Sequence, residues 1–363
     1  MPNLSESTAA DDAERMPFQG FAGMEGKKIL LITLGRKGDT SHNMFVALGD
    51  FLLKKYECRR TLINLSRGSA SRNILALLGY SIGGLKDVLW ADTVVVHVAA
   101  APSILLVAAA RLLMRKVVIF QWDVYPTTIN GVRHKDRLPH RILYKAEGVC
   151  LSLANLIVIP SEDFRGYVDG RKLAVMPLWP QSGLRLDPIL PKPIEDNTIR
   201  IAFAGQINEL RGLAECVAHL ESSSSNSIVL NIFSASELPL AFFSTLSSVR
   251  VQHHGLLPRE ELQQRLAGMH FGLVSLNPLL DQPGFPSKTF DYLASGLPIL
   301  YFGRPLPAYT SVIERFSVGV DITHRKNVDL KSMHDDIHSR FEIGRRNYID
   351  YTELKWRQIA EIC

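Results

Sequence analysis

The chain has 363 residues, of which 46% are hydrophobic and 21% charged, and its formal net charge is +5. This composition excludes a disordered or fibrous protein, and the length is sufficient for two ordinary globular domains. The four cysteines, Cys58, Cys150, Cys216 and Cys363, lack the spacing of a zinc or redox site. We therefore expect simple thiols in a reducing compartment.

The N-terminal segment, residues 1–24, is polar and acidic and has no apolar core. We expect it to be a disordered tail without an export signal. The apolar stretch from residue 94 to 120 is divided by His97, Pro102 and three basic residues. Its pieces are shorter than the ~20 residues that a bilayer requires, so we expect a strand, a buried helix and another strand. These observations predict a cytoplasmic protein.

The two halves of the chain differ in charge. Residues 26–190 hold 23 Lys and Arg against 12 Asp and Glu, a balance of +11, whereas residues 191–363 hold 17 against 19, a balance of −2. The basic residues of the first half form two runs, Lys54, Lys55, Arg59 and Arg60, and Arg133, Lys135, Arg137, Arg141 and Lys145. Such runs are either solvated faces or attract an anionic membrane surface, here the inner face of the plasma membrane, or a lipid phosphate. No nucleic-acid-binding motif accompanies them, so no nucleic acid partner is expected.

Short apolar runs alternate with helical patterns along the whole chain. In the first half they predict strands at residues 28–34, 60–64, 93–98, 117–121 and 156–160. After a proline-rich stretch, five more are predicted at residues 199–204, 227–233, 249–253, 271–275 and 298–302. This alternation is typical of parallel α/β sheets.

The two series of strands predict an α/β fold with two Rossmann-like domains that face a cleft. We expect the first domain at residues 25–180, a linker at 181–197, the second domain at 198–345, and a C-terminal helix at 346–363 that crosses back to the first domain. Ligands of open parallel sheets bind beyond the carboxyl ends of the strands. The substrate is therefore expected between the domains.

In the first domain, polar or flexible residues follow several predicted strands. Gly35 and Gly38 come after the first strand, where glycine permits close approach of a bound group, although a simple turn explains them equally well. His97 ends the third strand and Asp123 follows the fourth. A single polar residue at a strand end is often structural, but several at one edge favour a shared pocket.

The second domain has two glycine-bearing turns, each with a cation beside it. Gly205 and Arg211 follow its first strand, and Gly284 and Lys288 precede a short predicted helix. Glycine loops and helix starts offer free backbone N–H groups, so anions are expected to collect there. Arg211 and Lys288 together would clamp a diphosphate, whereas either one alone is more often an ordinary surface cation.

The short helix after Pro286 has further polar residues near its start. Ser287 or Thr289 is expected to cap the helix, and Asp291 lies about one turn from Lys288. Asp291 could therefore accept hydrogen bonds from a sugar whose phosphate is held by Lys288. A sugar nucleotide fits this arrangement.

Several segments, read in order, are similar to motifs of one enzyme family. They are VIPSE at 158–162, FAG at 203–205 with RGL at 211–213, HGLLP at 254–258 with EEL at 260–262, and PSKTFDYLASGLP at 286–298. They resemble motifs of the retaining glycosyltransferases of family 4, which have the GT-B fold, and the likeness covers nearly the whole chain. The segment at 286–298 is the most specific of them.

The resemblance implies roles for particular residues. On the donor side it implies contacts from Gly205, Gln206, Gly284, Phe285, Pro286, Ser287, Thr289 and Asp291. Asp291 is implied as the ribose ligand, and Ser161 and Glu162 as residues on the acceptor and sugar side. The chain departs from the family pattern at three positions, with Pro283 in place of an acidic residue, Gln206 in place of arginine and Trp122 in place of histidine.

The expected reaction is transfer of a sugar with retention, from a nucleotide donor to a saccharide or polyprenyl-linked acceptor in bacterial polysaccharide biosynthesis. Negative charge develops on the leaving diphosphate, and Arg211 and Lys288 are expected to stabilise it. Asp123 is expected to position an acceptor or sugar hydroxyl. No Asp-x-Asp motif occurs, so no metal or other cofactor is expected. Two alternatives remain, a nucleotide-binding relative without turnover and a sugar-nucleotide epimerase.

Overall fold

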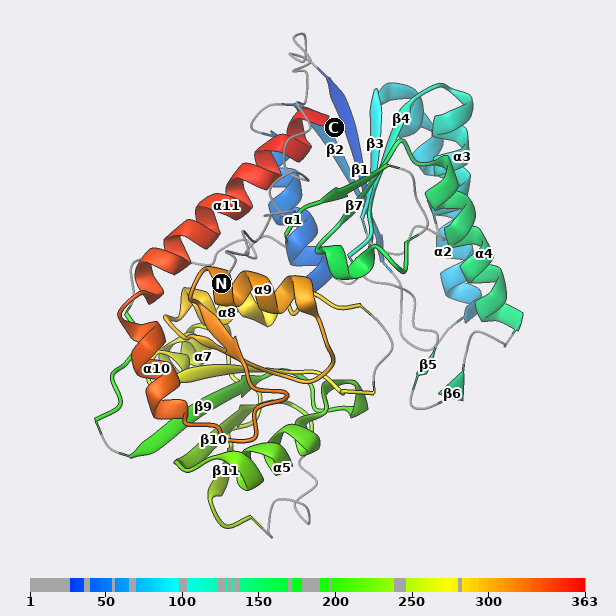
Figure 1. The fold of residues 1–363 in the computed structure, drawn as a ribbon. Coiled ribbons are helices and arrows are strands. Elements are labelled where there is room, and N and C mark those ends of the chain that lie inside the picture. The colour runs from blue at the N-terminus through cyan, green and yellow to red at the C-terminus, as the bar shows by residue number, and fades with distance from the viewer. Residues whose placement is uncertain are drawn as a thin grey trace, which may run out of the picture.

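The computed structural model consists of two α/β units, each built on its own parallel sheet (Figure 1). It describes residues 27–35, 40–53, 56–64, 70–97, 103–122, 128–129, 132–133, 138–168, 172–177, 190–195, 197–237, 246–279 and 283–362. The expected tail at residues 1–24, Gly38, Asp123 and most of the expected linker at 181–197 lie outside the described residues.

The first sheet has six parallel strands in the order β2-β1-β3-β4-β7-β8. Their bounds are β1 Lys28–Gly35, β2 Glu57–Asn64, β3 Thr93–His97, β4 Lys116–Phe120, β7 Leu156–Ile159 and β8 Leu173–Val175. A short antiparallel pair, β5 Thr128–Ile129 and β6 Val132–Arg133, stands apart from this sheet. The strands at the centre of the sheet are apolar on both faces, because helices cover both.

Two sets of helices cover the two faces of the first sheet. The helices are α1 Thr40–Leu53, α2 Ala70–Trp90, α3 Ile104–Leu112 and α4 Leu138–Leu153, followed by the 3₁₀ turn η4 Glu162–Phe164. Side chains of α2, α3 and α4 share one apolar cluster with Leu30 and Ile32 of β1. The neighbouring strand residues Ile29 and Leu31 point to the other face, which α1 covers. The stretch at residues 94–120 is thus a strand, a helix and a strand, as predicted.

The second sheet repeats this plan with the strand order β11-β10-β9-β12-β13-β14. Its strands are β9 Thr198–Ala204, β10 Ser227–Phe233, β11 Val249–His253, β12 Phe271–Ser275, β13 Ile299–Phe302 and β14 Gly319–Asp321. Its helices are η5 Glu209–Arg211, α5 Leu213–Ser223, α7 Arg259–Leu266, α8 Lys288–Ala294, α9 Pro307–Arg315 and α10 Leu330–His338. All strands are parallel, so the predicted class of two Rossmann-like sheets is confirmed.

Both sheets have a point where the strand order reverses. In the second sheet this point lies between β9 and β12, which are neighbours in the sheet although β10 and β11 lie between them in sequence. The connections that leave such neighbouring strands run to opposite faces of the sheet. They leave a crevice beyond the carboxyl ends of the strands, which is where ligands of this fold class bind.

The C-terminal helix α11, Phe341–Ile362, runs from the second unit along the first (Figure 1). Trp356 of this helix is buried, and its ring centroid lies 5.5 Å from that of Phe51 and 6.4 Å from that of Trp122. Its indole nitrogen donates a hydrogen bond to the carbonyl of Pro177 at 2.9 Å. Packing of α11 therefore ties the two units together.

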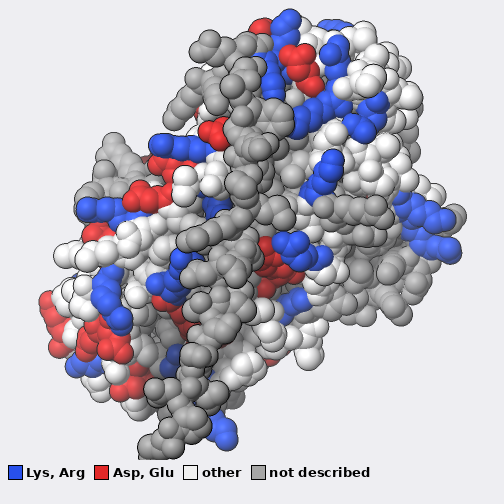
Figure 2. All heavy atoms as spheres, turned by 45° about the horizontal axis from the view of Figure 1, so that its top comes forward, with Lys and Arg blue, Asp and Glu red and all other residues white. Residues whose placement is uncertain are grey.

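Charged side chains are spread over the surface of both units. Figure 2 shows Lys and Arg side chains among uncharged atoms on the upper part of the molecule, where the first unit lies. Within the described part of the chain, no helix has both the length and the apolar character of a membrane-spanning segment.

Candidate functional site

A pocket of about 250 Å³ opens at the carboxyl edge of the second sheet, where the strand order reverses between β9 and β12. Three chain segments form its walls: the end of β9 with the turn after it, the end of β12, and the start of α8. The lining residues are Phe203, Ala204, Gly205, Gln206, Arg211, Leu273, Val274, Ser275, Pro286, Ser287 and Lys288. Six of the predicted site residues thus meet in one place, namely Gly205, Gln206, Arg211, Pro286, Ser287 and Lys288.

Backbone geometry fixes the turn that carries Arg211. Gly212 follows it in the left-handed region, with φ of 56°, and a Cβ atom there would lie 2.7 Å from Cα of Asn277. The amide of Asn277 donates to the carbonyl of Leu210 at 3.1 Å, and Oδ1 of Asn208 accepts from the amide of Leu210 at the same distance. The turn is therefore held against the end of β12, and the exposed Arg211 side chain lines the pocket.

The ammonium of Lys288 lies at the other side of the pocket, at the first residue of α8. It is 3.0 Å from Oδ2 of Asp291, and the side chains of Lys288 and Asp291 are 38% and 17% exposed. Ser287 occupies the N-cap position but makes no side-chain cap hydrogen bond. Thr289 is fully buried, and its hydroxyl lies 2.7 Å from that of Tyr309. The predicted cap by Ser287 or Thr289 is therefore wrong, because backbone bonds close this turn and Thr289 faces the core.

Phe285 and Gly284, which were predicted as donor contacts, are not among the residues that line this pocket. The ring of Phe285 packs edge-on against that of Tyr309, with ring centroids 5.4 Å apart. Phe285 also contacts the first-unit cluster that contains Phe164. Gly284 has room for a side chain, since a Cβ atom there would lie 3.9 Å from the nearest atom, Cδ1 of Leu276. Phe285 therefore helps to join the two units, and neither residue lines the pocket.

Tyr292 organises the pocket wall, although the sequence analysis assigned it no role. Its buried hydroxyl accepts a hydrogen bond from the amide of Ala204 at 2.8 Å and donates one to the carbonyl of Leu273 at 3.2 Å. Both partners line the pocket. The ring lies against Gly272, where a Cβ atom would be 2.2 Å from Cγ of Tyr292. A glycine inside a strand is the sequence signal for such a close approach.

His97 of the first unit is completely buried. Its Nδ1 lies 2.9 Å from the hydroxyl of Thr33, and its ring packs edge-on against Trp122 with centroids 4.4 Å apart. Burial lowers the pKa of His97 to about 3, so the ring is neutral at physiological pH. The structure places His97 in the interior at the carboxyl edge of the first sheet, the same edge at which Gly35 ends β1.

Ser161 and Glu162 lie where the first unit meets the second. The hydroxyl of Ser161 donates to Oδ2 of Asp163 at 3.3 Å, while Glu162 is exposed. The carboxylate of Asp163 accepts hydrogen bonds from the amides of Ala308 and Tyr309 at 3.0 and 3.1 Å. These amides belong to the first turn of α9, so a carboxylate of the first unit caps a helix of the second unit. The sequence analysis assigned no role to Asp163.

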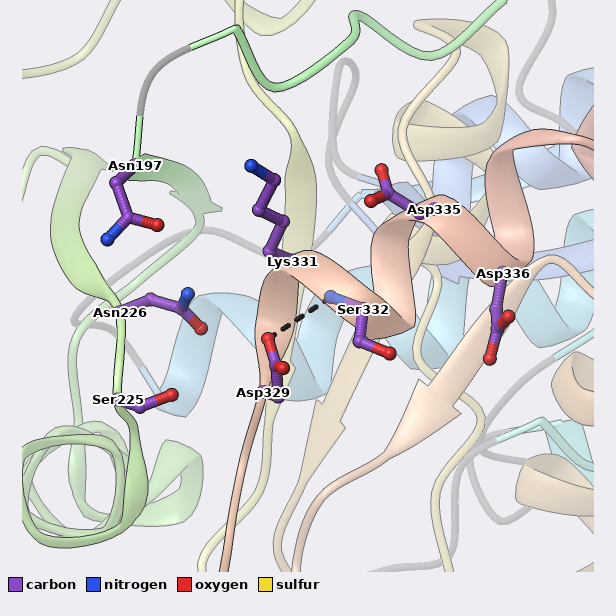
Figure 3. A pocket seen from close by; sticks show the side chains of 8 residues that line it. All are labelled: Asn197, Ser225, Asn226, Asp329, Lys331, Ser332, Asp335 and Asp336. Carbon is purple, nitrogen blue, oxygen red and sulfur yellow. Dashed lines mark hydrogen bonds between the residues drawn. The ribbon is translucent and has the colours of Figure 1, made fainter.

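A second and larger pocket, of about 440 Å³, lies at the opposite, amino-terminal edge of the second sheet (Figure 3). Its lining residues are Asn197, Ser225, Asn226, Asp329, Lys331, Ser332, Asp335 and Asp336. Three carboxylates and one ammonium make this lining unsuitable for a diphosphate, and the carboxylate of Asp329 already accepts a hydrogen bond from the amide of Ser332 at 3.1 Å. The pocket that contains Arg211 and Lys288 is therefore the candidate site.

Comparisons with known proteins agree with the two-sheet architecture. No family model and no curated protein matches the chain. Among solved structures, the chain is similar to the apo form of the lipopolysaccharide outer core galactosyltransferase WaaB, with 14% identity, a TM-score of 0.59, and 92% of this chain and 98% of that chain covered. It is also similar to a sucrose-phosphate synthase from Thermosynechococcus elongatus, with 12% identity, a TM-score of 0.62, and coverage of 93% and 98%.

A putative UDP-N-acetylglucosamine 2-epimerase from Listeria monocytogenes matches over 92% of this chain and 94% of that chain, with 11% identity and a TM-score of 0.51. At such identities the similarity extends to the fold and not to the activity. Together with the two parallel six-stranded sheets, these comparisons show that the chain has the GT-B fold.

Proposed function

We propose that this chain is a glycosyltransferase that moves a sugar from a nucleotide donor to a saccharide or lipid-linked acceptor, with retention and without a metal ion. The observation that carries the proposal is the convergence of Arg211 and Lys288 on one pocket at the strand-order reversal of the second sheet. The sequence resemblance points to bacterial polysaccharide biosynthesis in the cytoplasm.

The pocket lining suits a leaving diphosphate. When the bond between sugar and phosphate breaks, negative charge grows on the phosphate oxygens, and fixed donors stabilise this charge in the transition state. Arg211 offers a planar fork of N–H groups and Lys288 a point charge. The lining residues include two cations and no carboxylate, whereas a divalent metal ion prefers carboxylate oxygens. The lining therefore favours charge stabilisation by side chains.

The ion pair between Lys288 and Asp291 is compatible with this role. Partly exposed pairs of this kind contribute only about 0.2–1 kcal/mol, so a phosphate can draw the ammonium away from the carboxylate at small cost. Asp291 would then be available to accept hydrogen bonds from the ribose. The pocket volume of about 250 Å³ lies below the ~300–1,000 Å³ of typical ligand sites. We infer that it holds the diphosphate, and that the sugar extends toward the first unit.

The proposal is tested by donor binding and turnover with the purified protein. A panel of UDP-, GDP- and dTDP-sugars is screened by thermal shift, and transfer is then measured with the donor that stabilises the protein. Arg211→Ala and Lys288→Ala should each lower kcat by about a hundredfold or more, the loss seen when one transition-state donor is removed. Arg265→Ala, which removes an exposed cation of α7 away from the pocket, should retain full activity. Full activity in both pocket variants would refute the assignment.

Epimerisation of a sugar nucleotide is a second candidate, because a putative epimerase shares the fold over most of the chain. The two activities are separated by their products in the absence of an acceptor, since an epimerase converts the sugar of the nucleotide and a transferase does not. Tight nucleotide binding without turnover of either kind would identify a binding relative that has lost catalysis. The departures at Pro283, Gln206 and Trp122 are the residues to examine in that case.

A further inference from the structure

The outer surface of the helical layer α2–α3–α4 carries an unusual number of exposed apolar side chains. The inner sides of these helices pack on the first sheet, and α3 lies between α2 and α4. Nine of the sixteen exposed large hydrophobic residues in the described part of the chain lie on these helices or in the turn after α3. They are Ile82, Leu85, Leu89, Leu105, Leu112, Leu113, Met114, Ile142 and Val149, and we call them the apolar face.

The most prominent part of the apolar face is the turn that follows α3. Leu112 and Met114 are 85% and 91% exposed, so neither side chain contributes to the core. Single exposed apolar residues are common and need no explanation, but a concentration on one layer of helices marks an interaction site.

Met114 stands in a backbone conformation that its side chain disfavours. Its φ is 57°, in the left-handed region, where glycine is the usual residue at the end of a helix. The amide of Met114 donates to Arg111 O at 3.0 Å and that of Arg115 to Ala110 O at 2.8 Å, so the turn is a well-formed helix ending. A methionine here costs folding free energy and gains no packing in return. A cost of this kind at an exposed position suggests a function outside the folded chain.

Basic side chains accompany the apolar ones. Arg111 and Arg115 flank the turn, and Lys86, Arg141 and Lys145 lie on α2 and α4. Asp87 pairs with Arg59 at 2.9 Å, Asp92 lies 3.8 Å from Arg115, and buried Glu147 accepts a hydrogen bond from Gln121. Lys86, Arg111, Arg141 and Lys145 therefore leave a positive balance around the apolar face. On the upper part of the molecule, Figure 2 shows basic side chains beside uncharged surface, with some acidic side chains among them. The surroundings of the apolar face are therefore net positive, which is complementary to an anionic surface.

We propose that the apolar face docks on an anionic lipid bilayer. Leu112, Leu113 and Met114 insert below the headgroups, while the surrounding Lys and Arg side chains meet the lipid phosphates. Exposed leucine and methionine tips within a ring of cations are typical of proteins that lie on a membrane surface. A protein partner is less favoured, because protein interfaces are enriched in aromatic residues and none of the nine residues of the apolar face is aromatic.

The turn that inserts lies at the amino-terminal edge of the first sheet, because it leads from α3 to the start of β4. The apolar face extends from Ile142, in the first turns of α4, to Met114, beyond the last turn of α3. Because α4 leads into a parallel strand of the first sheet, its start lies at the carboxyl edge, which is the edge where ligands bind. The inserted turn and the ligand-binding edge therefore lie at opposite ends of the helical layer. The docking is independent of the proposed sugar transfer.

The test is co-flotation of the full chain with vesicles, without any nucleotide. We expect binding to vesicles of phosphatidylcholine and phosphatidylglycerol, weaker binding to phosphatidylcholine alone, and loss of binding as the Debye length falls from about 10 Å to about 3 Å between 0.1 and 1 M salt. Combining Leu112→Ser with Met114→Gly should weaken binding about tenfold or more, since it removes two inserted side chains.

The variants are chosen so that misfolding cannot imitate the result. Met114→Gly relieves the left-handed strain. The double variant should therefore lose no more stability than Leu112→Ser alone. Ile343→Ser removes an exposed apolar side chain of α11, outside the apolar face, and should bind like the wild type. Lack of binding to anionic vesicles, or equal binding by the double variant, would overturn the proposal. So would a dimer in solution that the double variant dissociates, because the face would then serve a second copy.

Discussion

Replacing Tyr292 with phenylalanine removes one oxygen atom and disconnects two walls of the candidate pocket. The hydroxyl accepts from the amide of Ala204 at 2.8 Å and donates to the carbonyl of Leu273 at 3.2 Å, and the side chain is fully buried. A buried amide left unsatisfied costs about 1–3 kcal/mol, and the lost bond to the carbonyl a further ~0.5–1.5 kcal/mol. We therefore expect a destabilisation of about 2–3 kcal/mol.

The assay combines scanning calorimetry with nucleotide binding. A domain of 150–250 residues shifts by about 2–4 °C for each kcal/mol, so the midpoint of the second-unit transition should fall by about 5–10 °C. Nucleotide affinity should also fall, because Ala204 and Leu273 both line the pocket.

The matched control for Tyr292→Phe is Tyr301→Phe. Tyr301 is a buried tyrosine of the same unit whose hydroxyl donates to the carbonyl of Arg304, outside the pocket. This variant should lose some stability and keep its nucleotide affinity. If Tyr292→Phe leaves both the midpoint and the affinity unchanged, the reasoning about the pocket wall is refuted.

Three further predictions concern backbone strain, pH and the contact between the units. Gly212→Ala should destabilise the chain by more than about 1 kcal/mol in urea unfolding, because the φ of Gly212, 56°, disfavours a side chain and a Cβ atom there would lie 2.7 Å from the backbone of Asn277. The control is Gly148→Ala, in helix α4 with open space around it, which should stabilise the chain by about 0.5–1 kcal/mol. Burial lowers the pKa of His97 to about 3 and that of His334 to about 4. In the unfolded chain both histidines regain the ordinary pKa of about 6.5, so below this pH the unfolded chain binds more protons than the folded chain. Stability should therefore fall as the pH drops from about 6.5 toward 4, and fall less in His334→Gln; an equal decline in both proteins would contradict this cause. Asp163→Asn should weaken the cap on α9 by about 1 kcal/mol and increase the radius of gyration in X-ray scattering, while an unchanged radius would show that other contacts suffice.

The architecture could be predicted from the sequence because parallel strands are buried on both faces and stand out as apolar runs. The ten predicted strands all occur, with ends displaced by at most three residues. Four strands were missed. Two of them, β8 and β14, have three residues each and lie at sheet edges, where so short a segment shows no pattern. The pair β5 and β6 was missed for the same reason of length.

The candidate site could be predicted in part. Glycine turns with adjacent cations indicated Gly205, Arg211 and Lys288, and the structure brings these residues together at one pocket. The direction of a side chain from a short helix could not be predicted, so Thr289 was expected at the ligand although it faces the core. The role of Tyr292 depends on backbone partners far away in the sequence, which no local pattern reveals.

The most direct test of the central claim is a crystal structure of the chain with a nucleoside diphosphate, grown with a chelator present. We predict that the guanidinium of Arg211 and the ammonium of Lys288 lie within hydrogen-bonding distance of the diphosphate oxygens, at the crevice between β9 and β12. A nucleotide bound elsewhere, or bound in this pocket with both cations directed away from its phosphates, would contradict the claim.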